Sequence, residues 1–150
     1  MTKTNTVAFQ AEEINNNLVA EGFVTVNGVT TPYAILRNSA FEIAPPKFVG
    51  YLAQTQEFFL SDETPEDFRD LVMAHEVFEF TLDGGPDGKG NCLKALLYEL
   101  TLVPDSIYTN YIRYRREFFA GMVNFIKEDC TRKRNMTESL AHLKELLQQE

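Results

Sequence analysis

The stretch MAHEVFEF (residues 73–80) places one imidazole and two carboxylates among large apolar side chains. On a helix that turns by about 100° per residue, His75 and Glu79 lie one turn apart on the same face, with Glu76 on its shoulder. An imidazole and a carboxylate at this spacing can bind one metal ion or form a buried polar pair. The spacing therefore predicts either a metal site or a polar cluster that only holds the fold.

Two residues further along the chain are candidate partners for these groups. Arg115 lies within the broad apolar face of one expected helix, and Glu99 lies at the margin of the apolar side of another. A buried guanidinium group needs a carboxylate, because an unpaired buried charge is costly. We therefore expect Arg115 to be buried and to form a structural ion pair with Glu79 or Glu99.

The first half of the chain carries strand and turn signals. Asn27-Gly28, within FVTVNGVTTPYAIL, is the strongest short signal for a β-hairpin. Apolar residues between Val7 and Leu18 recur at helical spacing, and Gly22 is expected to end that helix. Pro45-Pro46 is expected to open a short helix through about Gln54. The segment QEFFL (56–60) is expected to form a further strand.

The second half of the chain is predicted to be helical. The expected helices run from about Thr64 to Leu82, from Asn91 to Val103, from Pro104 to about Asp129, and from Met136 to the end. The segment KEDCTRKRN before the last helix is expected to be a mobile joint. The predicted fold is a single α+β domain over residues 1–150, with a small antiparallel sheet followed by packed helices.

This order of elements resembles the core of the zincin metallopeptidases. Strands, a last strand ending in LSDETP, and then a helix carrying A-H-E-V-F-E occur within residues 22–103. In the gluzincin branch of that family, the helix carries His-Glu-x-x-His and a downstream helix supplies a glutamate ligand. The resemblance implies a zincin-like core over residues 22–103, with C-terminal helices over residues 104–150. It also implies that His75 is a metal ligand, that Glu76 is the general base, and that Glu99 is the glutamate ligand.

Glu79 stands where the family has its second histidine, so the motif here is HExxE. Zinc sites of this family rely on two imidazoles, and a carboxylate in that place weakens the site and changes its charge. The resemblance therefore implies a degenerate, non-hydrolytic relative of unknown substrate, or, if the chain is active, a metal-dependent hydrolase. No resident cofactor is expected. Zinc, iron and manganese are the alternatives, with the harder metals better suited to one histidine and two glutamates.

A different class of function remains open beside the zincin-like one. The chain would then be a small helical interaction or scaffold protein, with a buried His-Glu-Arg cluster and no metal. The last helix would dock by one apolar edge, either within the chain or against a protein, a peptide or a second copy in a homodimer; the edge consists of Leu140, Leu143, Leu146 and Leu147. Arg115 counts against any metal if its charge points to the same place.

Composition restricts the partners further. The formal net charge of −8 argues against a nucleic acid and against an anionic membrane surface. No apolar run approaches the roughly 20 residues of a membrane-spanning helix. Cys92 and Cys130 are expected to be buried small hydrophobes in a protein of the reducing cytoplasm. With two histidines in the chain, no catalytic Cys-His pair is predicted.

Overall fold

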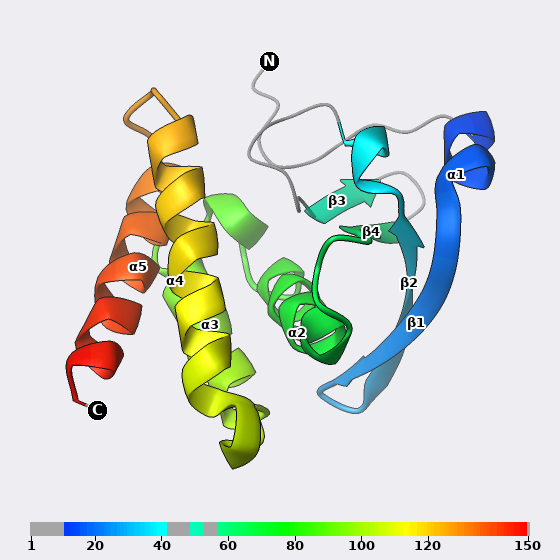
Figure 1. The fold of residues 1–150 in the computed structure, drawn as a ribbon. Coiled ribbons are helices and arrows are strands. Elements are labelled where there is room, and N and C mark those ends of the chain that lie inside the picture. Colours follow the sequence, from blue (N-terminus) through cyan, green and yellow to red (C-terminus); the bar gives the residue numbers. More distant parts are fainter. Residues whose placement is uncertain (1–10, 42–48, 53–56, 150) are drawn as a thin grey trace. The chain divides into compact units, whose positions relative to one another are not determined.

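The computed structural model describes residues 11–41, 49–52 and 57–149 (Figure 1). The chain divides into two compact units, Met1–Ala74 and His75–Glu150, and the boundary falls within helix α2 (Arg69–Phe80). Strands occur in the first unit, and helices follow in the second, so the predicted α+β class is confirmed. None of the helices in the described part of the chain is both long enough and apolar enough to cross a membrane.

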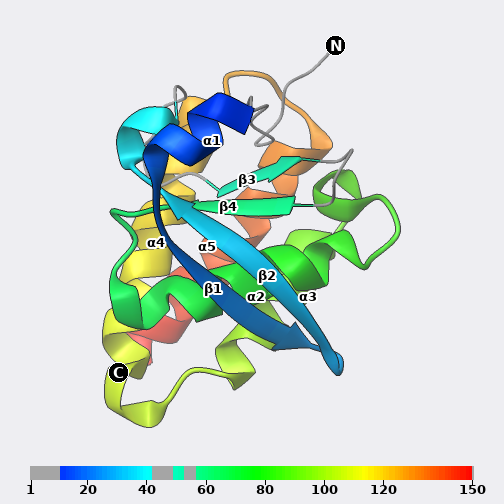
Figure 2. The same cartoon turned by 90° about the vertical axis from the view of Figure 1, so that its right-hand side faces the viewer.

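The first unit contains helix α1 (Ala11–Asn17) and a four-stranded sheet in the order β1-β2-β4-β3. The strands are β1 (Leu18–Val26), β2 (Val29–Leu36), β3 (Val49–Leu52) and β4 (Glu57–Ser61). Figure 2 shows β1 and β2 as a long twisted hairpin beside the shorter β3 and β4. The hairpin turn is the predicted Asn27-Gly28, and both residues have positive φ, as a tight two-residue turn requires.

The sheet differs from the prediction in one pairing. The β1–β2 and β3–β4 pairs are antiparallel as expected, but β2 and β4 run parallel. A parallel pair needs a long connection, and the stretch between Leu36 and Glu57 supplies it. Pro32 lies in β2 before the first residue that pairs with β4, so its missing N–H removes no bond from that ladder.

Two segments predicted to be helical are strands in part, although the first of them is helical as predicted over Ala11–Asn17. Gly22 does not end a helix but lies inside β1, opposite Tyr33, whose ring occupies the space where a Cβ atom would stand. The expected helix after Pro45-Pro46 is wrong at residues 49–52, which form β3, and the rest of that segment lies outside the described residues. Pairing with a neighbouring strand has outweighed the local helical signal in both places.

The second unit contains the end of α2 and three further helices. These are α3 (Asn91–Thr101), α4 (Tyr108–Phe125) and α5 (Thr131–Gln148), and α4 and α5 lie side by side (Figure 1). Short 3-10 turns precede α2, α3 and α4, at Glu66–Phe68, Gly85–Asp87 and Asp105–Ile107, and another follows β2 at Asn38–Ala40. The last helix begins at Thr131, five residues before the predicted Met136, so the second half of the segment KEDCTRKRN is helical.

Buried amides hold the loop between α2 and α3. Asn135 of α5 donates to the carbonyls of Pro86 and Gly88, at 3.2 and 2.8 Å, and accepts from the Gly90 N–H at 2.9 Å. Asn91 donates to two further carbonyls of the same loop. Because buried side-chain amides must be hydrogen-bonded, Asn91 and Asn135 hold this loop in one conformation and fix the point at which α3 begins.

Candidate functional site

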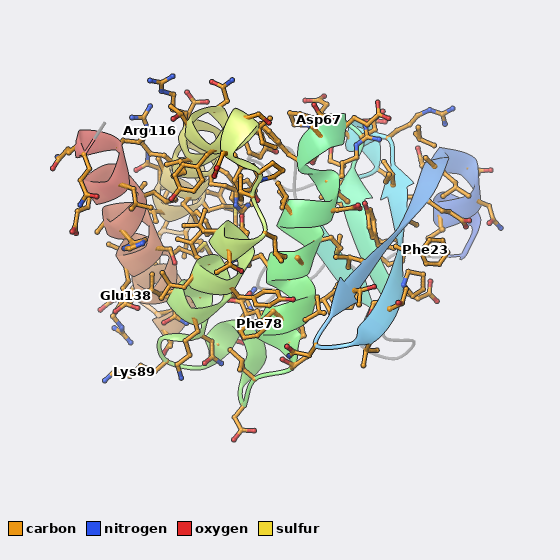
Figure 3. The ribbon with its side chains drawn as sticks, turned by 90° about the horizontal axis from the view of Figure 1, so that it is seen from below. Phe23, Asp67, Phe78, Lys89, Arg116 and Glu138 are labelled. Carbon is orange, nitrogen blue, oxygen red and sulfur yellow. The ribbon has the colours of Figure 1, made fainter. Side chains whose placement is uncertain are left out.

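Helix α2 carries the first two residues of the site into the second unit. His75 and Glu79 are 2% and 3% exposed, and His75 Nε2 lies 3.8 Å from Glu79 Oε1. The i, i+4 spacing brings them together, as the sequence predicts. Phe78 (labelled in Figure 3) stacks on Tyr98 of α3 with ring centroids 4.5 Å apart, which joins the two helices beside the site.

Glu99 of α3 is fully buried and contacts three side chains. Its Oε1 lies 2.7 Å from His75 Nδ1, and the Tyr111 hydroxyl donates a short hydrogen bond to its Oε2. Arg115 of α4 donates from Nη2 to Oε1 at 3.2 Å, and its Nε lies 2.8 Å from Oε2 although that N–H is not aligned for a hydrogen bond. Arg115 is therefore buried and paired with a carboxylate, as predicted, and the partner is Glu99.

Aromatic rings cover the buried guanidinium group. The Arg115 Cζ atom lies 5.0 Å from the ring centroid of Phe118 and 4.7 Å from that of Phe119. The Phe119 ring also lies 5.9 Å from the His75 ring, centroid to centroid. These contacts add a cation–π attraction to the ion pair and limit the movement of both charged groups.

The charges in this cluster shift the pKa values of its members. Burial alone would raise the pKa of Glu99, but the charge of Arg115 and the hydrogen bond from His75 lower it below its ordinary value. Burial alone would lower the pKa of His75, but hydrogen bonds to Cys92 and Glu99 and the charges of Glu99 and Glu79 raise it well above the ordinary value. Glu99 is thus an ionised acceptor that fixes the orientation of the imidazole.

Cys92 of α3 lies beside the other nitrogen of the imidazole. Its Sγ atom is 3.8 Å from His75 Nε2, and the Ser139 hydroxyl of α5 donates to it at 3.1 Å. Ligand atoms of His75, Glu79 and Cys92 all lie within 4.8 Å of one another. Nitrogen, oxygen and sulfur donors are thus gathered on one side of the imidazole, and this buried group can hold a metal ion.

The remaining acids of the site are also perturbed by burial. Burial raises the pKa of Glu79 to about 7, with the charge of His75 acting in the opposite direction. Burial also raises the pKa of Glu76, which is 8% exposed, and that of the Cys92 thiol.

A second arginine is buried in the helical part of the chain. Arg132 of α5 is 5% exposed, and its Nε donates to Asp87 Oδ1 at 3.1 Å.

The structure distributes the predicted ligands over two sides of the imidazole. His75 and Glu79 meet at Nε2, whereas Glu99 is bound to Nδ1 and to Arg115. Cys92, expected to be only a buried hydrophobe, is the donor that sequence analysis missed. One signal was present, because Cys92 and Glu99 are seven residues apart and therefore lie on the same helical face.

The cluster also contains the three groups of a thiol nucleophile. Cys92, His75 and Glu99 lie in the spatial order of a thiol, a base and an orienting carboxylate, a neighbourhood of cysteine and histidine that sequence analysis did not predict. All three are at most 3% exposed. A buried thiol whose pKa is raised forms little thiolate in the metal-free protein, so this order of groups does not make a nucleophile here.

Comparison with known proteins adds no further assignment. No protein-family model matches this sequence, and neither the curated proteins nor the solved structures give a match.

Proposed function

We propose that this chain is a non-hydrolytic, zincin-like protein. Its HExxE helix stabilises the second unit, His75–Glu150, which we call the helical unit, and does not take part in a reaction. The observation that supports this most directly is the position of Glu99. A gluzincin needs this glutamate on the metal, but here both of its oxygens are engaged by His75, Tyr111 and Arg115. A zinc site of the gluzincin kind therefore does not fit these residues.

The second support is the closure of the site. A catalytic zinc keeps an open position for water and substrate, whereas a structural site is closed. His75 and Glu79 are almost fully buried, and so is Glu76, the residue that would act as general base. A divalent ion, with zinc, iron and manganese as the candidates, would then serve the fold of the unit.

A peptide-hydrolysis assay tests this proposal. Purified protein is incubated with a mixture of fluorogenic peptides after removal of metal and again after addition of zinc. We expect no turnover above buffer in either state. Zinc-dependent turnover that is lost in Glu76→Gln would overturn the proposal. The matched control is Glu145→Gln, because Glu145 is an exposed glutamate on α5.

The second candidate is a metal-free helical interaction protein, with a protein, a peptide or a second copy as the partner. It is favoured by the exposed apolar side chains of the helical unit, Leu97, Leu102 and Phe125, which are 42–46% exposed. Sedimentation over a range of concentrations tests the homodimer. Self-association that Phe125→Ser abolishes, in protein that contains no metal, would favour this candidate over the first.

A further inference from the structure

We propose that His75 Nε2, the Glu79 carboxylate and Cys92 Sγ form a binding site for one thiophilic divalent ion, of which zinc is the natural example. This site goes beyond the proposed function, because it uses the nitrogen of the imidazole that Glu99 does not use and a sulfur ligand that the HExxE motif does not contain.

The distances between the donor atoms suit such an ion after a small contraction. A tetrahedral zinc site has bonds of about 2.0 Å to nitrogen or oxygen and about 2.3 Å to sulfur, so its donor atoms lie roughly 3.3 to 3.6 Å apart. The distances here are 3.8 Å from Nε2 to Cys92 Sγ and 3.8 Å from Nε2 to Glu79 Oε1. A shift of a few tenths of an ångström would bring Nε2 to bonding distance with each of the other two donors. The Glu79 and Cys92 donor atoms lie within 4.8 Å of each other, so that pair must approach by at most about 1.2 Å, which rotation of the two side chains can supply.

The neighbours of the three donors are those that metal ligands require. A histidine ligand donates its other N–H to a carboxylate, which fixes the tautomer and makes the metal-binding nitrogen more basic. Glu99 supplies that carboxylate at 2.7 Å, and Arg115 and Tyr111 hold it in place. The Ser139 hydroxyl donates to Cys92 Sγ at 3.1 Å, and such a donor stabilises a thiolate.

The charges buried in the helical unit leave room for a cation. Among the described residues, the buried carboxylates are Glu76, Glu79 and Glu99, and the buried guanidinium groups are Arg115 and Arg132. One negative charge is therefore unbalanced when His75 is neutral, and a Cys92 thiolate makes it two. A divalent ion balances both charges. In the metal-free protein, one proton on the His75 imidazole and one on the Cys92 thiol balance these two negative charges.

The donor set also selects among metals. A thiolate with an imidazole and one carboxylate favours zinc, cobalt or iron over manganese, calcium and magnesium, which prefer oxygen ligands. This differs from the expectation for one histidine and two glutamates, in which the harder metals were preferred. The preference for a metal changes because the third ligand is the sulfur of Cys92 and not the carboxylate of Glu99.

Cobalt titration of the full chain tests the site directly. A thiolate bound to Co²⁺ gives an intense sulfur-to-metal charge-transfer band in the near ultraviolet, and oxygen and nitrogen ligands do not. Metal-free, reduced protein should develop this band with a stoichiometry of one ion per chain, and zinc should then displace the cobalt. Manganese at the same concentration should not compete.

Two matched variants assign the sulfur. Cys92→Ser should abolish the band and weaken zinc binding at least tenfold. Cys130→Ser should leave both unchanged, because Cys130 is the other cysteine of the chain and caps α5 outside the donor group. The proposal is overturned if cobalt binds without the band, if the band survives in Cys92→Ser, or if zinc does not bind in the micromolar range or tighter.

X-ray absorption on zinc-loaded wild-type protein gives an answer even if Cys92→Ser fails to fold. One sulfur at about 2.3 Å and nitrogen or oxygen at about 2.0 Å are expected, and a shell without sulfur would refute the site. Hydrolysis is measured separately. Zinc binding without turnover supports both proposals, turnover with a sulfur ligand refutes only the proposed function, and no zinc binding refutes only this site.

Discussion

Replacement of Arg115 by methionine tests the buried ion pair on which the helical unit depends. The substitution keeps an unbranched apolar side chain between Phe118 and Phe119 and removes the guanidinium group that contacts both oxygens of Glu99. Loss of one partner from a buried pair costs about 3–5 kcal/mol, because the other charge stays buried. His75 still donates to Glu99, so we place the expected loss near the lower end, at about 3 kcal/mol.

Urea unfolding followed by far-ultraviolet circular dichroism measures this loss, since the chain contains no tryptophan for fluorescence. For a chain of this length, a loss of about 3 kcal/mol corresponds to a fall in Tm of roughly 6–12 °C. The matched control is Arg113→Met on the exposed side of the same helix, which should change the free energy of unfolding by less than about 1 kcal/mol.

A double-mutant cycle with Glu99→Gln separates the ion pair from simple packing. Each single variant leaves one buried charge without its partner, whereas the double variant removes both charges. The double variant should therefore lose about 2 kcal/mol or more less than the sum of the single losses. Additive losses, or a loss below about 1 kcal/mol in Arg115→Met, would mean that the pair does not contribute as its geometry indicates.

Three further predictions concern other features of the chain. Gly22→Ala should lower the free energy of unfolding by about 1–3 kcal/mol, measured by thermal melting. The Cβ atom of the alanine would lie 2.4 Å from the ring of Tyr33, and that ring cannot move away freely because the Tyr33 hydroxyl donates to Asp70 at 2.5 Å. Asn135→Ala should cost about 2–4 kcal/mol and speed hydrogen exchange at Gly90, since three hydrogen bonds from one buried side chain to the loop are lost; unchanged exchange would contradict this. Zinc affinity should rise as the pH rises above about 6, because a proton on Glu79, whose pKa is raised to about 7, and the protons on His75 and Cys92, whose pKa values are also raised, compete with the ion; calorimetry at several pH values measures it, and a flat profile would be evidence against these three residues as ligands.

Local sequence signals predict much of this fold. The hairpin at Asn27-Gly28 rests on turn chemistry and the helices of the second unit rest on apolar periodicity, and both signals act over a few residues. The parallel β2–β4 pair and the strand conformation at Gly22 depend on residues far away in the sequence. Periodicity within one segment cannot report such a pairing, because the energy that decides it comes from the other strand.

In the site, too, local sequence signals predict some features, whereas others depend on residues far apart in the sequence. The i, i+4 spacing predicts that His75 and Glu79 share a face, and an arginine inside an apolar face predicts a buried ion pair at Arg115. The position of Cys92 at Nε2, and that of Glu99 at Nδ1, depends on how α3 packs against the end of α2. Which nitrogen of an imidazole faces which neighbour is a property of helix packing, and no spacing within one helix determines it.

The position of Arg115 also reverses an argument against a metal ion. From sequence alone, a buried cation near His75 is expected to repel a metal ion, so that removal of the cation should strengthen binding. In the structure, Arg115 pairs with Glu99, and Glu99 accepts from Nδ1, on the opposite side of the ring from Cys92. Arg115 therefore keeps Glu99 ionised and the Nδ1 proton in place, which leaves the Nε2 lone pair facing the other two donors. We expect Arg115→Met to weaken zinc binding by about tenfold or more, measured by competition with a metal indicator in variant protein that remains folded. Tighter binding in that variant would show that the charge of Arg115 acts on the ion itself, and the roles assigned to the two ring nitrogens would then be wrong.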